Sequence, residues 1–507
     1  MLNDMPAWRS CVFAAIATAI HLPASALAAH ELPTPLETAE YARLSTSEEI
    51  SAYLAQLARE FPQARVERFG TTVEGRPLEA LVLTGAPHGD VATADRLTVE
   101  IIGSQHGMEG AGSETLLFVA RELLAGSLKH VLDDIDVVLV PNANPDGREV
   151  GLRVNANQVN LNTDFVTLTQ PESQALVESF QRYRPEVVLD VHESAILKKR
   201  SLALEGYMTD FTVQFEMANN PNIVRSLRTF AFEELLTPWI AGVDAAGVQS
   251  HRYFGEITSS RQAVTNGGLS LNNLRNRAGI DGRLSFLMET RLDPKDGDYP
   301  TYRNIGQRVA LQRISIERFL LEAHRKRTDA LEAVATARDQ VRSEPLALDV
   351  RYVAEPGDPP VAIGLRRIDN GQVERIKFAD SRTVAAGGRL RMPAAYVVRG
   401  EQLEVRELLD RHSIRYSILD KPRQQPGVEF AIDATTTNPS AALDKVRERT
   451  VRVDAQPGDL WIDLDQSRGR LAALLLEPRS DSSLLRTPAF SPLVLNGQSL
   501  PIYRIPR

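Results

Sequence analysis

The sequence is poor in several features that mark whole classes of protein. It holds one cysteine, Cys11, in 507 residues, which excludes a disulfide framework. Aromatic residues make up only 6% of the chain, but 43% of the residues are hydrophobic and 24% are charged, so the chain is neither disordered nor collagen-like. Acidic side chains outnumber basic ones by 66 to 58, a net charge of −8. We therefore expect no nucleic-acid partner.

Long apolar runs are also missing. The mostly apolar stretch 11–22 is shorter than the run of about 20 residues that spans a bilayer. It follows Arg9 and precedes Ala26-Leu27-Ala28, a small-x-small pattern typical of signal peptidase sites. We predict a signal peptide over residues 1–28, with cleavage after Ala28 or Ala29, and a periplasmic or secreted protein without stable membrane insertion once the leader is removed. A buried N-terminal helix is the alternative, because Asp4 is unusual in such a leader.

Apolar strands alternate with helical patterns in the first part of the chain. Residues 97–103 and 135–141 each form a strand pattern, and leucines and valines at helical spacing lie between them, from Leu116 to Leu124. Two further strand patterns cover 187–191 and 284–288. This order predicts an α/β fold with a mixed, mostly parallel sheet and helices on both faces.

The character of the chain changes near residue 345. A long helical pattern from Tyr302 to Arg342 is followed by short strand-like runs between Pro and Gly turns, such as 385–388. We predict an α/β domain over 29–344 and a smaller β-rich domain over 345–507, with a β-sandwich as the default architecture. Its expected elements include strands at 474–478 and 501–504 and a core position at Trp461.

Polar clusters follow the predicted strands, and the first contains His106 and Glu109. A His-x-x-Glu motif where a strand passes into a helix can direct an imidazole and a carboxylate at one divalent metal. His192, at the end of another predicted strand, supplies a third ligand of the right type. Two His and one Glu with an open fourth position are typical of a catalytic zinc. We expected Asp190 to point away from this site.

Other polar residues could supply the remaining groups that amide hydrolysis needs. The chemistry requires a metal that activates water, a carboxylate that takes its proton and a cation that stabilises the oxyanion. Glu289 ends an apolar strand, and Arg153 follows a turn-rich loop after another strand. The strand-end positions place these groups at the edge of the sheet where ligands bind in α/β proteins.

These motifs resemble the zinc metallocarboxypeptidase family of the carboxypeptidase A type, in its bacterial secreted branch. The similarity runs from about Tyr41 to Glu322 and includes the segment Gly70-Thr71-Thr72-Val73-Glu74-Gly75-Arg76-Pro77-Leu78. The resemblance implies one zinc ion bound by His106, Glu109 and His192. It also implies Glu289 as the general base, Arg153 as the group that polarises the scissile carbonyl, and a peptide as the substrate.

The sequence departs from the family at two positions. Where the family commonly has Asp-x-Asn-Arg, this chain has Asn160-Leu161-Asn162-Thr163. Asn162 and Thr163 thus stand at the substrate-binding pair, but Thr163 cannot replace an arginine that clamps a carboxylate with two hydrogen bonds. Asn160 stands where a carboxylate orients a metal-binding imidazole, and an amide can accept the same hydrogen bond.

Other residues could complete the substrate site. A different cation could replace the clamp, and the candidates are Arg200, Arg252, Arg261, Arg275 and Arg277. Tyr253 or Tyr207 could serve as the family's mobile tyrosine.

Three functions fit these residues. The first is a zinc metallocarboxypeptidase that hydrolyses peptide bonds near a C-terminus. The second is a zinc amidohydrolase acting on N-acyl amino acids, or an enzyme acting on cell-wall peptides with an unusual linkage. The third is a non-catalytic, zinc-retaining binding protein whose recognition resides in the β-rich domain. Retention of both Glu289 and Arg153 favours an enzyme.

Overall fold

The computed structural model of the chain describes residues 32–85, 96–293, 304–341, 343–400, 402–432, 439–495 and 499–507. The predicted leader, residues 1–28, lies outside these described residues. Among the described residues, no helix combines the length and the apolar character needed to cross a membrane.

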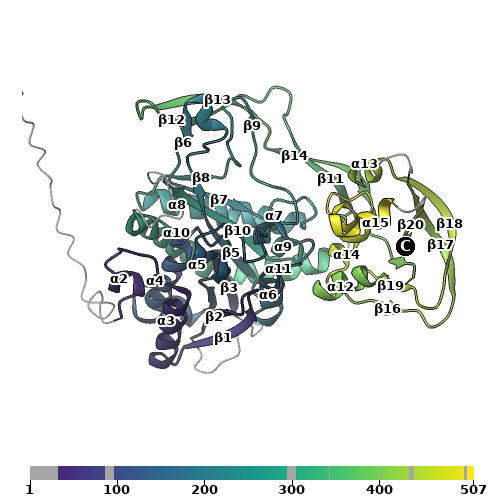
Figure 1. Cartoon of the computed structure of the whole chain (residues 1–507), viewed down its shortest axis with the longest axis horizontal. Coiled ribbons are helices and arrows are strands. Elements are labelled where there is room, and N and C mark those ends of the chain that lie inside the picture. The colour runs from purple at the N-terminus through teal and green to yellow at the C-terminus, as the bar shows by residue number, and fades with distance from the viewer. Residues whose placement is uncertain are drawn as a thin grey trace, which may run out of the picture.

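An eight-stranded mixed sheet forms the centre of the larger body, in the order β1-β2-β4-β3-β5-β10-β7-β8 (Figure 1). Strands β4, β3, β5 and β10 run parallel to one another. The pairs β4–β2, β2–β1 and β10–β7 are antiparallel, and β8 is parallel to β7. The strands are β1 (Ala64–Thr71), β2 (Pro77–Leu83), β3 (Leu97–Gly103), β4 (Ile135–Val140), β5 (Val187–Ala195), β7 (Val213–Met217), β8 (Ser250–Arg252) and β10 (Leu284–Leu292).

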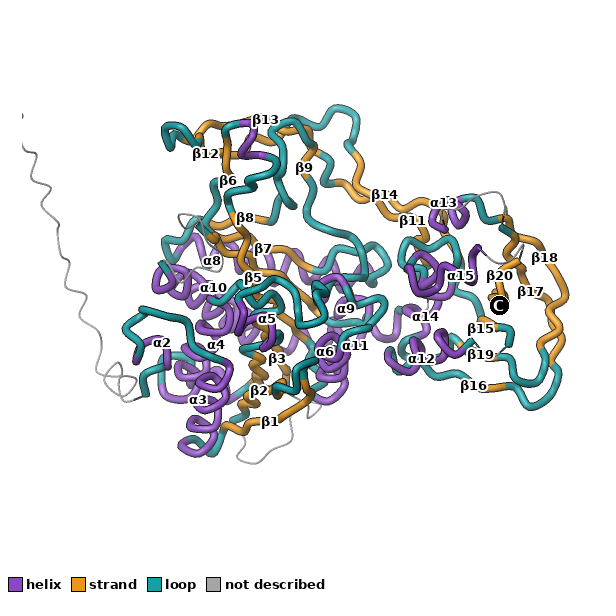
Figure 2. Tube along the Cα trace, in the orientation of Figure 1, coloured by secondary structure: helices purple, strands orange, loops and turns teal. Residues whose placement is uncertain are grey.

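Helices cover both faces of this sheet, which confirms the predicted α/β fold (Figure 2). Alternate residues of a strand point to opposite faces, so Val99 and Ile101 of β3 pack in one apolar cluster and Ile102 in the other. The helices are α2 (Pro35–Thr38), α3 (Ser47–Glu60), α4 (Ala111–Ala125), α5 (Pro145–Val150), α6 (Pro171–Arg182), α7 (Arg225–Phe230), α8 (Thr237–Ala245), α9 (Leu274–Ile280), α10 (Ile305–Arg325) and α11 (Arg327–Gln340).

The region after α11 is rich in strands, as predicted. A six-stranded sheet in the order β16-β19-β15-β20-β17-β18 is accompanied by four helices. These elements are β15 (Ala395–Val398), α12 (Leu403–Arg411), β16 (Ser417–Ile418), β17 (Arg423–Ala431), α13 (Pro439–Asp444), β18 (Arg447–Ala455), β19 (Leu460–Asp463), α14 (Gly469–Leu476), α15 (Ser491–Leu495) and β20 (Ser499–Ile505). The domain boundary at residue 345 itself stays a prediction.

Part of this later region returns to the larger body. Strands β11 (Leu346–Val353) and β14 (Thr383–Leu390) pair with each other, and β12 (Val361–Arg367) and β13 (Val373–Asp380) form a hairpin between them. The hairpin pairs with β6 (Tyr207–Thr209) and β9 (Ala263–Val264), above the central sheet in Figure 1. Residues separated by more than a hundred positions in sequence thus share one small sheet.

Three local expectations for this region differ from the structure. The leucines at 474–476 end helix α14 rather than forming a strand, because a short apolar run fits either element. The stretch 385–388 lies within β14 rather than in a turn. The six strands form one sheet with helices rather than a sandwich of two sheets. Trp461 is 8% exposed and is a core residue, as expected.

His412, at the end of α12, ties the later region to the larger body. Its Nε2 lies 2.9 Å from the carbonyl oxygen of Val166. Burial, together with the nearby guanidinium of Arg277, lowers the pKa of His412 to about 3. The unfolded chain takes up this proton below about pH 6.5, whereas the folded protein does not. Stability is therefore lost as the pH falls below 6.5.

We expect the free energy of unfolding to fall by about 2 kcal/mol between pH 6.5 and 5 because of His412 alone. Urea unfolding of wild-type protein and of His412→Gln at these two pH values checks this. The fall in the variant should be smaller than that in wild type by about this amount, whereas a substitution of the exposed His130 should leave the fall unchanged. An equal dependence in His412→Gln and wild type would show that another group is responsible.

Candidate active site

The carboxyl ends of neighbouring parallel strands bring the predicted site residues together. His106 and Glu109 lie in the loop between β3 and α4, and His192 lies near the end of β5. Glu289 lies on β10 directly opposite His192 in the parallel register. Gly107 allows the loop to approach α5, because a Cβ atom there would lie 2.1 Å from the backbone of Gly147. The loop is thereby fixed beside the segment that leads to Arg153.

His106, Glu109 and His192 form a buried cluster able to hold a metal ion. One ligand atom from each lies within 4.8 Å of the others. Glu109 Oε1 is 2.7 Å from His106 Nδ1, and Glu109 Oε2 is 2.9 Å from His192 Nδ1. The two Nδ1 atoms are 3.2 Å apart. Four-coordinate zinc with bonds of about 2.1 Å separates its ligands by about 3.4 Å, so this donor set suits zinc.

The charges of the cluster also favour a cation. Burial raises the pKa of Glu109, but the two imidazoles outweigh this and hold it well below its usual value. Burial lowers the pKa of His192, yet the carboxylates of Asp190 and Glu109 raise it well above its usual value. Two buried carboxylates therefore surround one imidazole. A divalent ion can replace the proton that they stabilise.

Outer residues orient both imidazoles through the nitrogen that faces away from the cluster. His106 Nε2 lies 3.0 Å from Asn160 Oδ1, so the amide occupies the place expected for it. His192 Nε2 lies 2.9 Å from Asp190 Oδ1, and Gln105 donates to the same oxygen at 2.6 Å. The expectation that Asp190 points away was wrong. Residues two apart on a strand share a face, and this period was the signal that could have identified it.

Asn160 offers a direct test of this outer contact. We expect Asn160→Ala to weaken zinc binding by about 10- to 100-fold, because the ring of His106 loses its acceptor. Asn160→Asp should bind zinc more tightly than wild type, since a carboxylate makes the imidazole a stronger ligand. Competition with a chromophoric chelator measures both affinities. Substitution of the exposed Asn157 is the control, and a change of similar size there would argue against a role for Asn160.

Glu289 lies beside the cluster without being part of it. On its other side it pairs with Gln214 of β7. Its Oε2 atom is buried and has no hydrogen-bond partner among the described residues. Burial, opposed by the charge of His192, raises the pKa of Glu289 to about 7. A carboxylate with this pKa can both accept and return a proton near neutral pH.

Arg153 reaches the cluster from the loop after α5. Its Nη1 lies 3.0 Å from Glu109 Oε1, and 51% of its side chain is exposed, so it borders the open side of the metal cluster. Arg76, in the family-like segment 70–78, acts further away. Its Nη1 lies 2.6 Å from Asp146 at the start of α5, and Thr72 donates to the same carboxylate at 2.8 Å. This segment therefore holds the helix that precedes Arg153.

Asn162 and Thr163 occupy a short 3₁₀ turn beside the cluster. Asn162 Nδ2 is 3.3 Å from His192 Nε2, and Asn162 Oδ1 accepts from the backbone N–H of Leu274 at 3.0 Å. The Thr163 hydroxyl donates to the carbonyl oxygen of Asn160 at 2.9 Å. The structure thus brings Asn162 to the cluster and shows the side chain of Thr163 bonded to its own turn.

The five arginines considered as replacements for the clamp differ in their surroundings. Arg252 forms an ion pair with the buried carboxylate of Glu216 at 2.9 Å, and Arg277 pairs with Asp281 at 2.8 Å. Arg275 Nη2 donates to the Gly268 carbonyl at 3.0 Å. Arg200 and Arg261 are exposed.

The two tyrosine candidates are also separated by the structure. Tyr207 donates to Glu374 at 2.7 Å on the β12–β13 hairpin. Burial, and after it the charge of Glu289, raise the pKa of Tyr253, so this tyrosine faces the same region as Glu289. Lys198, which no sequence motif singles out, pairs with Glu256 at 2.9 Å, and its charge partly opposes the raised pKa of Glu289.

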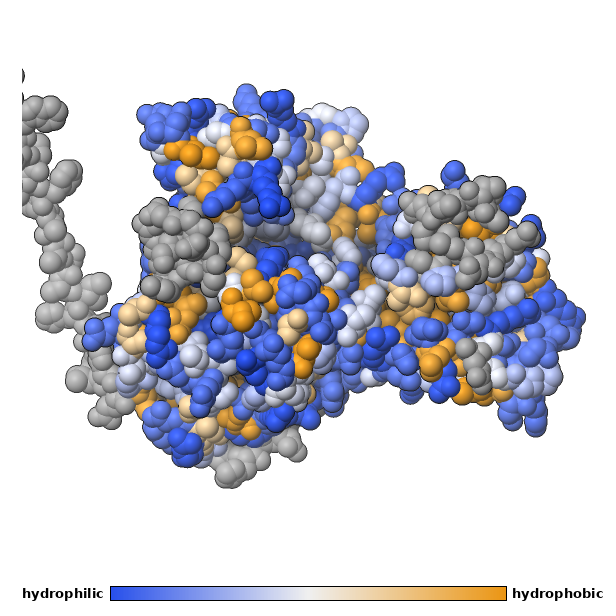
Figure 3. All heavy atoms as spheres, viewed as in Figure 1, coloured by the Kyte–Doolittle hydropathy of each residue, from blue (hydrophilic) through white to orange (hydrophobic). Residues whose placement is uncertain are grey.

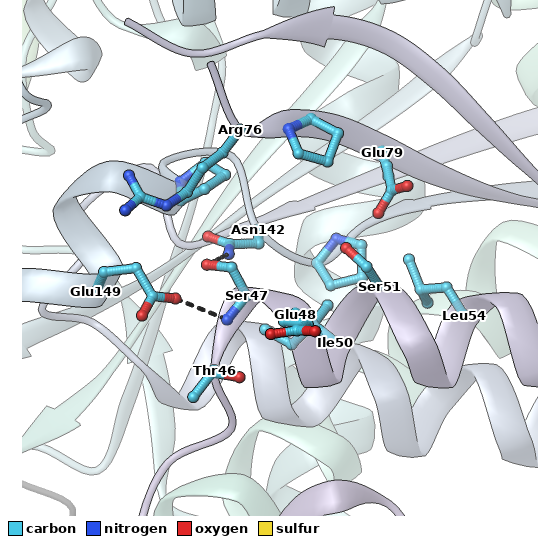
Figure 4. A pocket seen from close by; sticks show the side chains of 13 residues that line it. Thr46, Ser47, Glu48, Ile50, Ser51, Leu54, Arg76, Glu79, Asn142 and Glu149 are labelled. Atoms are coloured by element: carbon cyan, nitrogen blue, oxygen red, sulfur yellow. Dashed lines mark hydrogen bonds between the residues drawn. The ribbon is translucent and has the colours of Figure 1, made fainter. Parts of the chain in front are cut away.

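A separate cavity of about 470 Å³ lies at the N-terminal end of α3 (Figure 4). Ser47 bonds there with Asn142 and Glu149, and Arg76 and Glu79 form the opposite wall. None of the three metal-cluster residues lines it. This cavity is therefore distinct from the candidate active site.

Comparison with protein families supports this reading of the site. Residues 50–197 match a family model described as zinc carboxypeptidase, and this range includes His106, Glu109 and His192. "Carboxypeptidase 2" of Trichophyton tonsurans is 23% identical over 464 residues, which cover 85% of this chain and 81% of that protein. "Probable carboxypeptidase 2" of Trichophyton verrucosum is 27% identical over 227 residues, but the chain spans only 43% of its length.

Solved structures with a similar chain trace include a metallo-carboxypeptidase from Burkholderia cenocepacia. It is 22% identical, with a TM-score of 0.43, and the match covers 56% of this chain and 70% of that chain.

Proposed function

We propose that this chain, which carries a zinc carboxypeptidase domain matched over residues 50–197, is a zinc metallocarboxypeptidase that hydrolyses peptide bonds near the C-terminus of its substrate. The observation that carries the proposal is the position of Glu289. Its side chain is half-buried on the strand next to His192, and its Oε2 atom is buried without a hydrogen-bond partner among the described residues. A binding protein needs no such base beside its metal.

We assign one residue to each step of hydrolysis. When bound, zinc supplies a Lewis acid that polarises the scissile carbonyl and lowers the pKa of water. Arg153 donates to the same carbonyl oxygen and stabilises the negative charge that develops on it. Glu289 takes the proton from the attacking water and then returns it to the leaving amine. Asp190 and Asn160 keep the imidazoles of His192 and His106 in the orientation that binds the metal.

Release of free amino acid from short peptides tests the proposal. Zinc-loaded and chelator-treated protein are compared on peptides with free and amidated C-termini and on N-acyl amino acids. We expect zinc-loaded protein to cleave peptides with a free C-terminal carboxylate. A chelator should abolish this cleavage, and added zinc should restore it. Hydrolysis of N-acyl amino acids alone would instead identify an amidohydrolase. Zinc binding without any turnover would identify a binding protein.

The proposed location is the periplasm or the outside of the cell. The support is the apolar run 11–22 and the small residues at 26–28. N-terminal sequencing of protein from the producing cells tests this, with a mature N-terminus at Ala29 or His30 as the expected result. An intact Met1 would contradict it.

A further inference from the structure

A cavity of about 580 Å³ lies between the two regions of the chain. One wall is the loop 253–270, which includes Tyr253 and Ser270. The other wall comes from the later region, where Arg351 and Tyr352 of β11 and the segment 481–482 line the cavity. Figure 3 shows this face of the molecule hollowed between the hairpin at the top and the body below.

Backbone hydrogen bonds link the loop wall of this cavity to the elements that carry the metal cluster and Glu289. The backbone N–H of Tyr253 donates to the carbonyl oxygen of Phe215 on β7. Gln214, the residue before Phe215, is paired with Glu289 on β10. Four residues after the loop, the backbone N–H of Leu274 donates to Asn162, whose Nδ2 is 3.3 Å from His192 Nε2. Tyr253 itself lines the cavity, and the charge of Glu289 helps to raise its pKa after burial. The loop is therefore a shared border of the cavity and the metal cluster.

The wall from the later region is held in place by hydrogen bonds. Asn219 donates to the Tyr352 hydroxyl at 2.9 Å, and its own oxygen accepts from Asn276 of α9 at 3.1 Å. Asp481 accepts from the backbone N–H of Val350 at 2.7 Å. Strand β11 is thus a fixed part of the cavity, and the position of Arg351 follows from it.

The charges in the cavity leave a cation available. Glu256 pairs with Lys198 at 2.9 Å, and Asp481 is bonded to backbone, so both lining carboxylates have partners. Arg351 pairs at 2.8 Å with Asp349, two residues away, and these side chains are 63% and 47% exposed. Such an exposed pair contributes about 0–1 kcal/mol, so a carboxylate from a substrate can compete for the guanidinium.

A second guanidinium adds positive charge behind the loop wall. Arg275 Nη2 donates to the Gly268 carbonyl, and its Nε is buried without a partner among the described residues. Arg252 and Arg275 share one buried carboxylate, that of Glu216. Burial raises the pKa of Glu216, and the positive charges of both arginines partly lower it again. Arg252, Arg275 and Glu216 together therefore carry one positive charge behind the loop wall.

We infer that this cavity receives the leaving residue of the substrate and that Arg351 binds a carboxylate on it. The inference rests on the proposed carboxypeptidase function. Arg351 supplies the bidentate donor that Thr163 lacks, and it comes from β11 rather than from the turn beside the metal cluster. The carboxylate is either the α-carboxylate of the peptide or that of an acidic side chain.

Peptides that differ only at the last residue test the inference. We expect Arg351→Ala to lower kcat/KM at least 10-fold for a peptide ending in Glu with a free C-terminus, and Arg351→Glu to lower it further. A similar loss for peptides ending in Gln and Lys identifies the α-carboxylate as the ligand, whereas a loss confined to Glu identifies the side chain. The matched control is Arg389→Ala, an exposed arginine on β14 in the same two-stranded sheet. Equal profiles for Arg351→Ala and Arg389→Ala would overturn the inference.

Binding separates this inference from the proposed function. Calorimetry of the same peptides with zinc-loaded Glu289→Gln protein, with and without Arg351→Ala, measures recognition without turnover. An affinity for the Glu peptide that falls at least 10-fold with Arg351→Ala supports the cavity assignment even if wild-type protein hydrolyses no peptide. Hydrolysis by wild type combined with unchanged affinity would leave the proposed function intact and overturn the role of Arg351.

Discussion

Glu289→Gln is expected to lower kcat/KM for peptide hydrolysis by about 10²- to 10⁴-fold while zinc stays bound at one ion per chain. The amide keeps the size of the side chain but cannot take a proton from water. His106, Glu109 and His192 are unchanged in this variant, so the metal cluster is expected to remain. Steady-state kinetics and metal analysis of the same preparation give both values.

Glu186→Gln is the matched control for this variant. Glu186 precedes β5 at the opposite end of the sheet, and burial raises the pKa of its carboxyl group as it does for Glu289. Its substitution should leave kcat/KM within about twofold of wild type, because it lies far from the strand ends that carry the site. Hydrolysis by Glu289→Gln at the wild-type rate would show that the proposed mechanism is wrong.

Arg308→Met is expected to destabilise the protein by about 3–5 kcal/mol, because it leaves a buried carboxylate without its partner charge. Arg308 of α10 contacts both oxygens of Glu193, at 2.6 and 2.7 Å, and both side chains are almost fully buried. Glu193 also accepts from the backbone N–H of Ala111 at the start of α4. Urea unfolding measures the change.

The double variant Arg308→Met/Glu193→Gln should recover most of this loss, since no charge is then buried alone. Arg313→Met on the same helix breaks a pair with Glu317 whose side chains are 41% and 25% exposed, and it should cost about 1 kcal/mol or less. Because Glu193 follows His192 directly in the sequence, we also expect Arg308→Met to weaken zinc binding. Unchanged stability in Arg308→Met would show that the pair is replaced by other contacts.

The sequence predicted what depends on local pattern. Strand and helix periods gave the α/β fold, and the strand-end rule brought His106, Glu109 and His192 together with Glu289 beside them. The same period of two, applied to β5, would have placed Asp190 beside His192. The prediction of a strand at the leucines of α14 was wrong, because a short apolar run has no distinctive period.

What depends on pairing between distant segments could not be predicted. Nothing in the residues around Arg351 indicates that β11 forms a wall of the cavity, because that position follows from Tyr352 contacting Asn219. The same holds for Arg252, whose partner Glu216 lies 36 positions earlier in the sequence.

The pairing of the β12–β13 hairpin with β6 and β9 sets the order in which parts of the site can form during synthesis. Strand β9 has its parallel partner at residues 379–380, and β6 pairs with residues 365–367. A ribosome that has released the chain only as far as α11 has therefore exposed every metal ligand and Glu289, but not the strands that fix the loops around them. The loops around the metal cluster can thus reach their final positions only after residue 380 has been synthesised.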